Sequence, residues 1–250
     1  MQIRKSALCG ATLMLGLSLA AQGRPATNLD WAFHGSSAAD RYSAAAQITP
    51  ANVAGLTEAW RFPMDAGGLE SQPIKIGHTV YVITTTRTIA ALDAATGAVK
   101  WTFDPGIAGT QPVRGLATWN DNGKLRLIYG REHFLYLVDA ETGKPVPSFG
   151  DNGRIDAREN LRGRAEDNAV YLTSTEAVYQ NLIIVNARLA ENTPASPGDV
   201  RAFDARTGKL VWTFHTIPHP GEVGADTWPA DAWLNQGVAN AWSGASVDAQ

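Results

Sequence analysis

The stretch "ALDAATGAVKWTF", Ala91 to Phe103, occurs again as "AFDARTGKLVWTF", Ala202 to Phe214. A more divergent copy, "LVDAETGKPVPSF", runs from Leu137 to Phe149, and a half-copy, "LTEAWRF", ends at Phe62. Each full copy predicts two short strands around a turn, in which the Asp caps the turn, the Gly adopts a positive φ, and the second strand ends in Trp-x-Phe. The chain is therefore predicted to repeat one β-sheet unit.

The spacing of the copies indicates how these units are assembled. Their aspartates, Asp93, Asp139 and Asp204, lie 46 and 65 residues apart, and the β-rich runs "TVYVITTT", "LRLIYG" and "NLIIVNA" precede the copies. A period of about 40 to 50 residues with four strands per unit is typical of propeller blades, with a loop insertion in the longer gap. The repeated Trp is predicted to dock one blade on the next. The expected fold class is all-β: a β-propeller of four-stranded blades, incomplete, with three to four blades in this chain.

Long segments with a helical period are missing from the sequence, which excludes an α/β fold. The helical candidate is the short run "TPANVAGLTEAW", where Thr49 is expected to cap a turn begun by Pro50.

The first 21 residues predict a targeting segment. Arg4 and Lys5 precede an apolar run from Ala7 to Ala20, which ends in small residues, so residues 1–21 are expected to be a cleaved signal peptide and the protein periplasmic. The alternative is an N-terminal helix packed on the domain. Cys9, the only cysteine of the chain, lies within this segment, so no disulfide is expected after cleavage. The formal net charge of -3, without a basic stripe, argues against a nucleic-acid partner.

Several phrases of the chain resemble one enzyme family. The phrases "DRYSAAAQITPANVAGLTEAW", "ALDAATGAVKW", "VRGLATW", "GDVRAFDARTGKLVWTFHTIPHPGE" and "NAWSGASVD" occur in the order found in dehydrogenases that use pyrroloquinoline quinone (PQQ), above all the glucose-dehydrogenase-like branch. The resemblance implies an eight-bladed propeller more than twice as long as this chain, with residues 28–250 as its N-terminal portion. It also implies PQQ as cofactor and calcium, which prefers oxygen ligands, beside the reactive carbonyl.

The resemblance assigns cofactor-binding roles to five residues of this chain: Glu70, Arg114, Thr173, Ser174 and Trp242. Arg114 suits planar recognition of a carboxylate or carbonyl, and Trp242 would form the floor under the quinone. Glu70 could instead be a solvated loop carboxylate, and the two hydroxyl residues could be structural.

For the metal, the resemblance assigns Glu191 and Asn192, which offer a carboxylate and an amide oxygen, although acidic loop residues are common. Thr175 and Glu176 stand where relatives usually carry prolines, so the local backbone there is expected to differ. His215 and His219 are four residues apart, but Pro218 and Pro220 exclude a helix; a loop or strand-end role is expected rather than a transition-metal site.

The resemblance also bears on substrate. The adjacent cysteine pair of alcohol-oxidising relatives is replaced by "GTQPV" before Arg114, which favours a sugar or polyol substrate over methanol or ethanol. Electrons would pass to ubiquinone or a periplasmic carrier, with peripheral inner-membrane contact. The family's catalytic Asp would lie beyond Gln250, so no catalytic residue is assigned here and the chain alone is expected to be inactive.

The rival hypothesis is a non-catalytic propeller that serves as a periplasmic scaffold or assembly protein. A scaffold gives no reason to retain the set Glu70, Arg114, Glu191 and Trp242 together.

Overall fold

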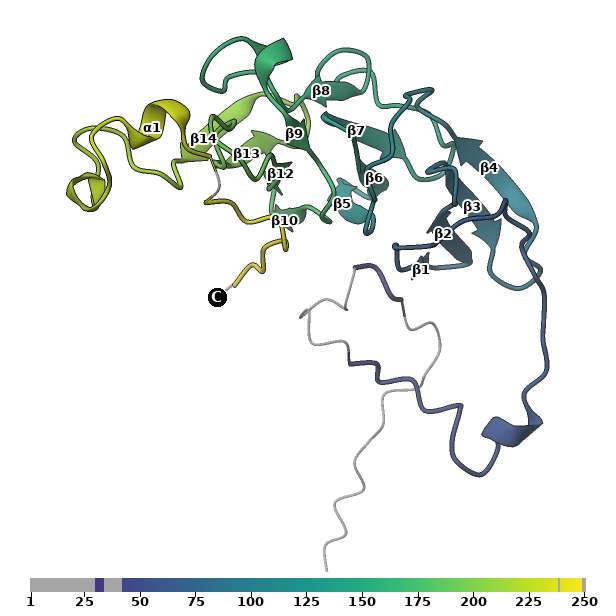
Figure 1. The fold of residues 1–250 in the computed structure, drawn as a ribbon. Coiled ribbons are helices and arrows are strands. Elements are labelled where there is room, and N and C mark those ends of the chain that lie inside the picture. The colour runs from purple at the N-terminus through teal and green to yellow at the C-terminus, as the bar shows by residue number, and fades with distance from the viewer. Residues whose placement is uncertain (1–29, 34–41, 238, 249–250) are drawn as a thin grey trace, which may run out of the picture.

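The computed structural model describes residues 30–33, 42–237 and 239–248, so the predicted signal peptide, 1–21, lies outside the described residues. Three antiparallel four-stranded sheets follow one another along the chain and form an arc, with the C-terminal segment on its inner side (Figure 1). The prediction of an all-β propeller portion with four-stranded blades is confirmed. No closed ring of sheets is present among the described residues.

The strands of each sheet are hydrogen-bonded in sequence order. The first sheet contains β1 (Ile74–Ile76), β2 (Thr79–Ile83), β3 (Ile89–Asp93) and β4 (Val99–Phe103). The second contains β5 (Ala117–Asp121), β6 (Lys124–Arg131), β7 (Phe134–Asp139) and β8 (Arg154–Asp156). The third contains β10 (Ala177–Tyr179), β11 (Leu182–Val185), β13 (Val200–Asp204) and β14 (Leu210–Phe214).

The remaining elements are short and lie in the longer connections. A two-stranded ladder joins β9 (Val170–Tyr171) to β12 (Arg188–Leu189). The helical elements are η1 (Val53–Gly55), η2 (Ala165–Asp167), η3 (Ala225–Thr227) and α1 (Ala232–Asn235). None of the helices in the described ranges is long and apolar enough to cross a membrane.

The repeated phrase forms the predicted turn. In the first copy, Oδ1 of Asp93 accepts hydrogen bonds from the backbone N–H of Ala95 and from both the backbone N–H and the hydroxyl of Thr96, at 3.0–3.1 Å. Gly97 then adopts φ 72°, a left-handed conformation that suits glycine. Asp139 and Asp204 accept the same three bonds in their own turns.

The second copy departs from the prediction of two strands. After Asp139 the chain makes a single bridge, Val138 to Pro145, and the fourth strand of the sheet is the later β8. Pro145 and Pro147 have no backbone N–H to donate to a ladder, which explains why this segment does not form a strand.

Tryptophan docking on the turn of the following unit is observed for two copies, of which Trp60 lies in the segment before the first sheet and Trp101 on β4. The indole N–H of Trp60 donates to the carbonyl of Ala94 at 3.1 Å, and that of Trp101 donates to the carbonyl of Ala140 at 3.1 Å. Both rings lie directly against the turn glycine, because a Cβ on Gly97 or Gly143 would come within 2.7 Å of the indole. Each Trp therefore packs on the turn of the following unit.

The third turn is covered differently. A Cβ on Gly208 would lie 2.7 Å from the side chain of Ile155, so Ile155 takes the place that Trp holds at the other two turns. Trp212, the docking residue of the third copy, lies on β14 at the end of the row of sheets and is 38% exposed.

The hydrophobic core lies between successive sheets. One cluster of buried side chains fills the space between the first and second sheets, and its members include Tyr81, Ile89, Leu127, Tyr129 and Val138. The other cluster fills the space between the second and third sheets, and its members include Ile128, Leu135, Leu137, Ile183 and Phe203. Burial of each such side chain contributes about 1.5–3 kcal/mol.

The short helical candidate near the N-terminus forms only the 3-10 turn η1. The roles of its polar residues also differ from the expectation, because Oδ1 of Asn52 accepts a bond from the Thr49 N–H at 2.7 Å. The side chain of Thr49 does not cap the helix.

Candidate functional site

Four of the predicted cofactor residues come together. The backbone N–H of Arg114 donates to the carbonyl of Thr173 at 3.1 Å, and its guanidinium carbon lies 5.4 Å from the ring centroid of Trp242. The hydroxyl of Ser174 donates to the backbone carbonyl of Trp242. We refer to Arg114, Thr173, Ser174 and Trp242 as the arginine–tryptophan cluster.

Three separate segments supply this cluster. Arg114 lies just before β5, at the start of the second sheet, and Thr173 and Ser174 lie between β9 and β10, at the start of the third. Trp242 comes from the segment that follows α1, and its backbone N–H donates to the side-chain oxygen of Asn240 at 3.1 Å. The repeat thus brings inner-strand starts of neighbouring sheets together, and the C-terminal segment lies against them.

The cluster and the nearby residues Thr175 and Asn186 contain buried polar atoms that have no hydrogen-bond partner among the described residues. They are the hydroxyl of Thr173, Nη1 of Arg114, the hydroxyl of Thr175 and both amide atoms of Asn186. Thr173 is fully buried and Asn186 is 4% exposed. Buried polar groups in folded proteins are nearly always paired, so atoms such as these indicate a site that a polar ligand or ordered water completes.

Thr173 and Asn186 lie just beyond the β9–β12 ladder. The ladder ends with the pair Tyr171 and Arg188, and Thr173 and Asn186 are each two residues past that pair along their own segments. Both side chains are buried.

Glu176 adds a buried acid next to the cluster. It is 5% exposed, and neither carboxyl oxygen has a hydrogen-bond partner in the described part of the chain. Burial raises the pKa of Glu176 to about 8, so this side chain is mostly protonated at neutral pH. A Cβ on Gly130 of β6 would lie 2.7 Å from its Oε1, which places the carboxyl group against the second sheet.

The cluster has the chemistry that a flat tricarboxylate such as PQQ requires. Arg114 and Thr173 offer unused donors for carboxylate or carbonyl oxygens, and a guanidinium binds such groups in its plane. Trp242 is 49% exposed, which leaves ring surface for stacking. The residues present therefore fit this cofactor.

The other three predicted residues are not joined to the cluster. Glu70, Glu191 and Asn192 are all exposed, and none makes a hydrogen bond or ion pair with another described residue. Their oxygen atoms remain available to a cation, and their assigned roles stay predictions.

Sequence reasoning missed a polar group on the β9–β12 ladder itself. Nη1 of Arg188 donates to Oε1 of Gln111 at 3.1 Å, and its guanidinium lies 6.0 Å from the ring centroid of Tyr171. Arg188 and Asn186 alternate along "VNARLA", which is a weak strand signal that could have indicated a shared polar face.

The chain as a whole is similar to several known proteins. Residues 31–250 match the PQQ family model described as "Glucose/ethanol/alcohol dehydrogenase, beta-propeller domain". The chain is 29% identical to a quinoprotein glucose dehydrogenase of Gluconobacter oxydans over 88% of this chain and 31% of that protein. It is 32% identical to the dehydrogenase subunit of a quinone alcohol dehydrogenase of the same organism, over 85% of this chain and 29% of that protein.

A solved structure shows the same likeness. The quinohemoprotein alcohol dehydrogenase of Comamonas testosteroni superposes with a TM-score of 0.63 at 28% identity, covering 76% of this chain and 28% of that one. The chain spans about a third of the length of the curated relatives it matches.

Proposed function

Because this chain belongs to the PQQ-dependent dehydrogenase family, as a β-propeller portion of it, we propose that it forms one part of the cofactor site of a dehydrogenase that oxidises a sugar or polyol hydroxyl. The arginine–tryptophan cluster, with its unpaired buried donors, is the observation that supports this proposal. A bound PQQ supplies the chemistry of the reaction, since it accepts the hydride equivalent from the alcohol carbon.

In this proposal each cluster residue has a distinct task. The guanidinium of Arg114 holds a carboxylate or carbonyl oxygen of the cofactor, and the hydroxyl of Thr173 donates to a second oxygen. The indole of Trp242 supports the ring plane, and the bond from Ser174 to the Trp242 carbonyl keeps that segment against the third sheet. The cluster thereby positions the cofactor and limits the access of water to it.

The cation is proposed to be calcium, bound through the oxygen atoms of Glu191 and Asn192, with Glu70 beside the quinone. Both proposed ligands are exposed, so their oxygen atoms are accessible to an ion. No transition metal is needed for this role.

The preference for a sugar or polyol has two supports. The sequence "GTQPV" before Arg114 lacks the adjacent cysteines expected of alcohol-oxidising relatives, and glucose dehydrogenase is among the relatives. Transfer of electrons to ubiquinone or a periplasmic carrier and peripheral inner-membrane contact are proposed with it from the family resemblance. The charged and apolar pattern of residues 1–21 supports the proposed periplasmic location.

The substrate proposal is tested by reconstituting the intact protein with PQQ and Ca²⁺ and following reduction of an artificial electron acceptor. D-Glucose and a linear polyol are expected to give kcat/KM values at least about tenfold above those of ethanol and methanol. A preference for short alcohols would overturn the sugar or polyol assignment while leaving a PQQ dehydrogenase in place.

The 250-residue chain alone is expected to give no turnover with any of these substrates, since the general base is expected outside it. Turnover by the isolated chain would contradict this. Failure of the intact protein to bind PQQ at all would favour a non-catalytic scaffold.

A further inference from the structure

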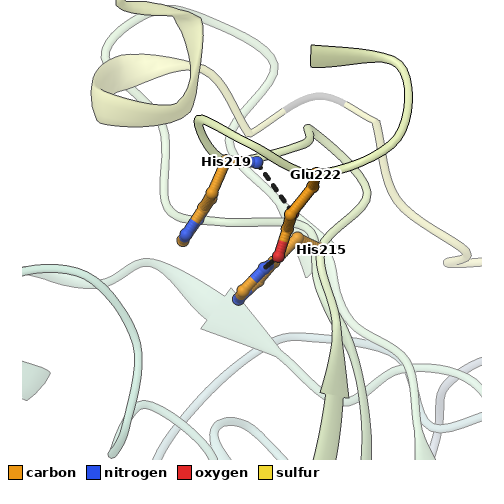
Figure 2. Close-up of side chains that lie close together, drawn as sticks. All are labelled: His215, His219 and Glu222. Atoms are coloured by element: carbon orange, nitrogen blue, oxygen red, sulfur yellow. Dashed lines mark hydrogen bonds and ion pairs between the residues drawn. The ribbon is translucent and has the colours of Figure 1, made fainter.

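Two imidazoles and a carboxylate meet in the loop that follows β14. The rings of His215 and His219 are stacked with their centroids 3.7 Å apart and their planes at 11°. Glu222 lies beside both: one oxygen is 2.8 Å from Nδ1 of His215, and the other accepts the backbone N–H of His219 at 2.8 Å (Figure 2). We refer to these three residues as the histidine loop site.

The expected loop position of the histidines is confirmed, and the loop brings the rings together without a helix. The absence of a helix, on which the sequence argued against a transition-metal site, therefore does not exclude one. Pro218 and Pro220, on either side of His219, fix φ at two positions of a tight connection. The N–H of Glu222 donates back to the carbonyl of His219 at 3.0 Å, which closes the turn. The sequence "HTIPHPGE" therefore presents three side chains to one point.

We propose that the histidine loop site binds a divalent transition-metal ion of the Zn²⁺ class. Imidazole nitrogen and carboxylate oxygen are common ligands of such ions, and two histidines with one acidic residue form a frequent ligand set. One potential ligand atom from each of the three residues lies within 4.8 Å of the other two.

A small rearrangement completes the coordination. Ligand atoms around a tetrahedral zinc ion lie about 3.3 Å apart, since each bond is about 2.0–2.1 Å. The ligand atoms of the loop site, which lie within 4.8 Å of one another, must therefore close by up to about 1.5 Å, and the rings must turn out of their parallel stack. The side chains of His215 and Glu222 are 25% and 44% exposed, so these movements need no repacking of the core.

The surroundings provide room for a fourth ligand. A cavity of about 10 Å³ beside His219, enough for roughly one water molecule, is lined by Asp199, Thr216 and Trp233 among others. The ring centroid of Trp233 lies 4.9 Å from that of His219. The carboxyl group of Asp199 lines the same cavity as His219.

This site differs in chemistry from the calcium position of the proposed function. Calcium prefers an all-oxygen shell, whereas a site with two imidazole nitrogens favours Zn²⁺, Ni²⁺ or Cu²⁺. Metal binding at the histidine loop site can therefore be tested independently of PQQ binding.

The test is calorimetric titration of Zn²⁺ into the full chain, without an affinity tag and after removal of metals by a chelator. We expect one saturable site, and at least about tenfold weaker binding in His219→Ala and in Glu222→Gln. His78→Ala removes an exposed histidine outside the loop and is expected to leave the affinity unchanged.

Co²⁺ gives a second readout that does not depend on stability. Visible absorption bands typical of tetrahedral coordination are expected in the wild-type chain and are expected to be lost in His215→Gln and His219→Gln. Equal Zn²⁺ affinity in the wild type and His219→Ala, or binding lost equally in His78→Ala, would overturn the proposal.

Discussion

The indole N–H of Trp101, on the last strand of the first sheet, donates to the carbonyl of Ala140 in the turn of the second sheet at 3.1 Å. The hydroxyl of Tyr81 donates to the same carbonyl at 3.1 Å, and its ring centroid lies 5.9 Å from that of Trp101. One backbone oxygen thus receives two donors from the preceding sheet. Trp60, in the segment before the first sheet, makes the same contact with the turn of the first sheet.

Two substitutions of Trp101 are expected to distinguish the stability contributed by packing of its ring from that contributed by its hydrogen bond. Trp101→Phe keeps most of the apolar contact and leaves the Ala140 carbonyl bonded to Tyr81, so we expect a loss of only about 1 kcal/mol in unfolding free energy. Trp101→Ala removes the ring as well and is expected to cost about 3 kcal/mol. Urea unfolding of the two variants measures the difference, and equal losses would contradict docking by the ring.

A matched pair of glycine substitutions tests the close approach of that ring. Gly143 and Gly123 both have positive φ, but a Cβ on Gly143 would lie 2.5 Å from the Trp101 ring, whereas one on Gly123 would meet nothing within 4 Å. We expect Gly123→Ala to cost about 1 kcal/mol from backbone strain alone. Gly143→Ala is expected to cost at least about 1 kcal/mol more, from overpacking. Thermal unfolding of both variants measures the two losses of stability. Equal shifts of the unfolding temperature would contradict the close approach of the Trp101 ring to Gly143.

The stability of the cofactor-free protein is expected to fall between about pH 4.5 and pH 8 because of Glu176. Burial raises the pKa of this acid from 4.5 to about 8, so in this range the unfolded chain releases a proton that the folded chain keeps. The slope contributed by one such group is at most about 1.4 kcal/mol per pH unit. Below this range the group is neutral in both states and contributes nothing.

Glu176→Gln is the control for this pH dependence, since the amide does not ionise. Denaturant unfolding at pH 5 and pH 8 should show a smaller decline in the variant than in the wild type. Asp199, whose pKa is raised by burial, contributes in the same direction in both proteins. Identical pH profiles would show that Glu176 ionises in the folded protein as it does in the unfolded one.

The fully buried hydroxyl of Thr173 is expected to matter for the ligand and not for the fold. Thr173→Val keeps the shape and removes a hydroxyl that has no partner in the described residues, so unfolding free energy should be unchanged or slightly raised. Affinity for PQQ is expected to fall by about tenfold or more, because a hydrogen bond to a charged group is lost. A variant that is destabilised and binds PQQ normally would assign Thr173 to the structure instead.

The repeat predicted the architecture because its turn chemistry is local. Asp93, Thr96 and Gly97 form their turn from neighbouring residues, so spacing alone indicated the blades and the docking Trp. The missing strand after Asp139 depends on two prolines that were visible in the sequence but masked by its similarity to the other copies. Ile155, which replaces Trp at Gly208, comes from outside the repeated phrase and has no sequence signal.

The site was predictable only in part, for a different reason. Arg114, Thr173 and Trp242 come from three segments, and family resemblance was needed to associate them. The stacking of His215 on His219 depends on how a proline-containing loop folds back, which no helical or strand period encodes.

Equilibrium binding of PQQ in the presence of Ca²⁺, followed by quenching of tryptophan emission in the intact protein, tests whether the arginine–tryptophan cluster holds the cofactor. We expect saturable binding that is weakened at least about tenfold in Arg114→Ala and is unchanged in His78→Ala. Equal affinity of the wild type and Arg114→Ala would contradict this expectation.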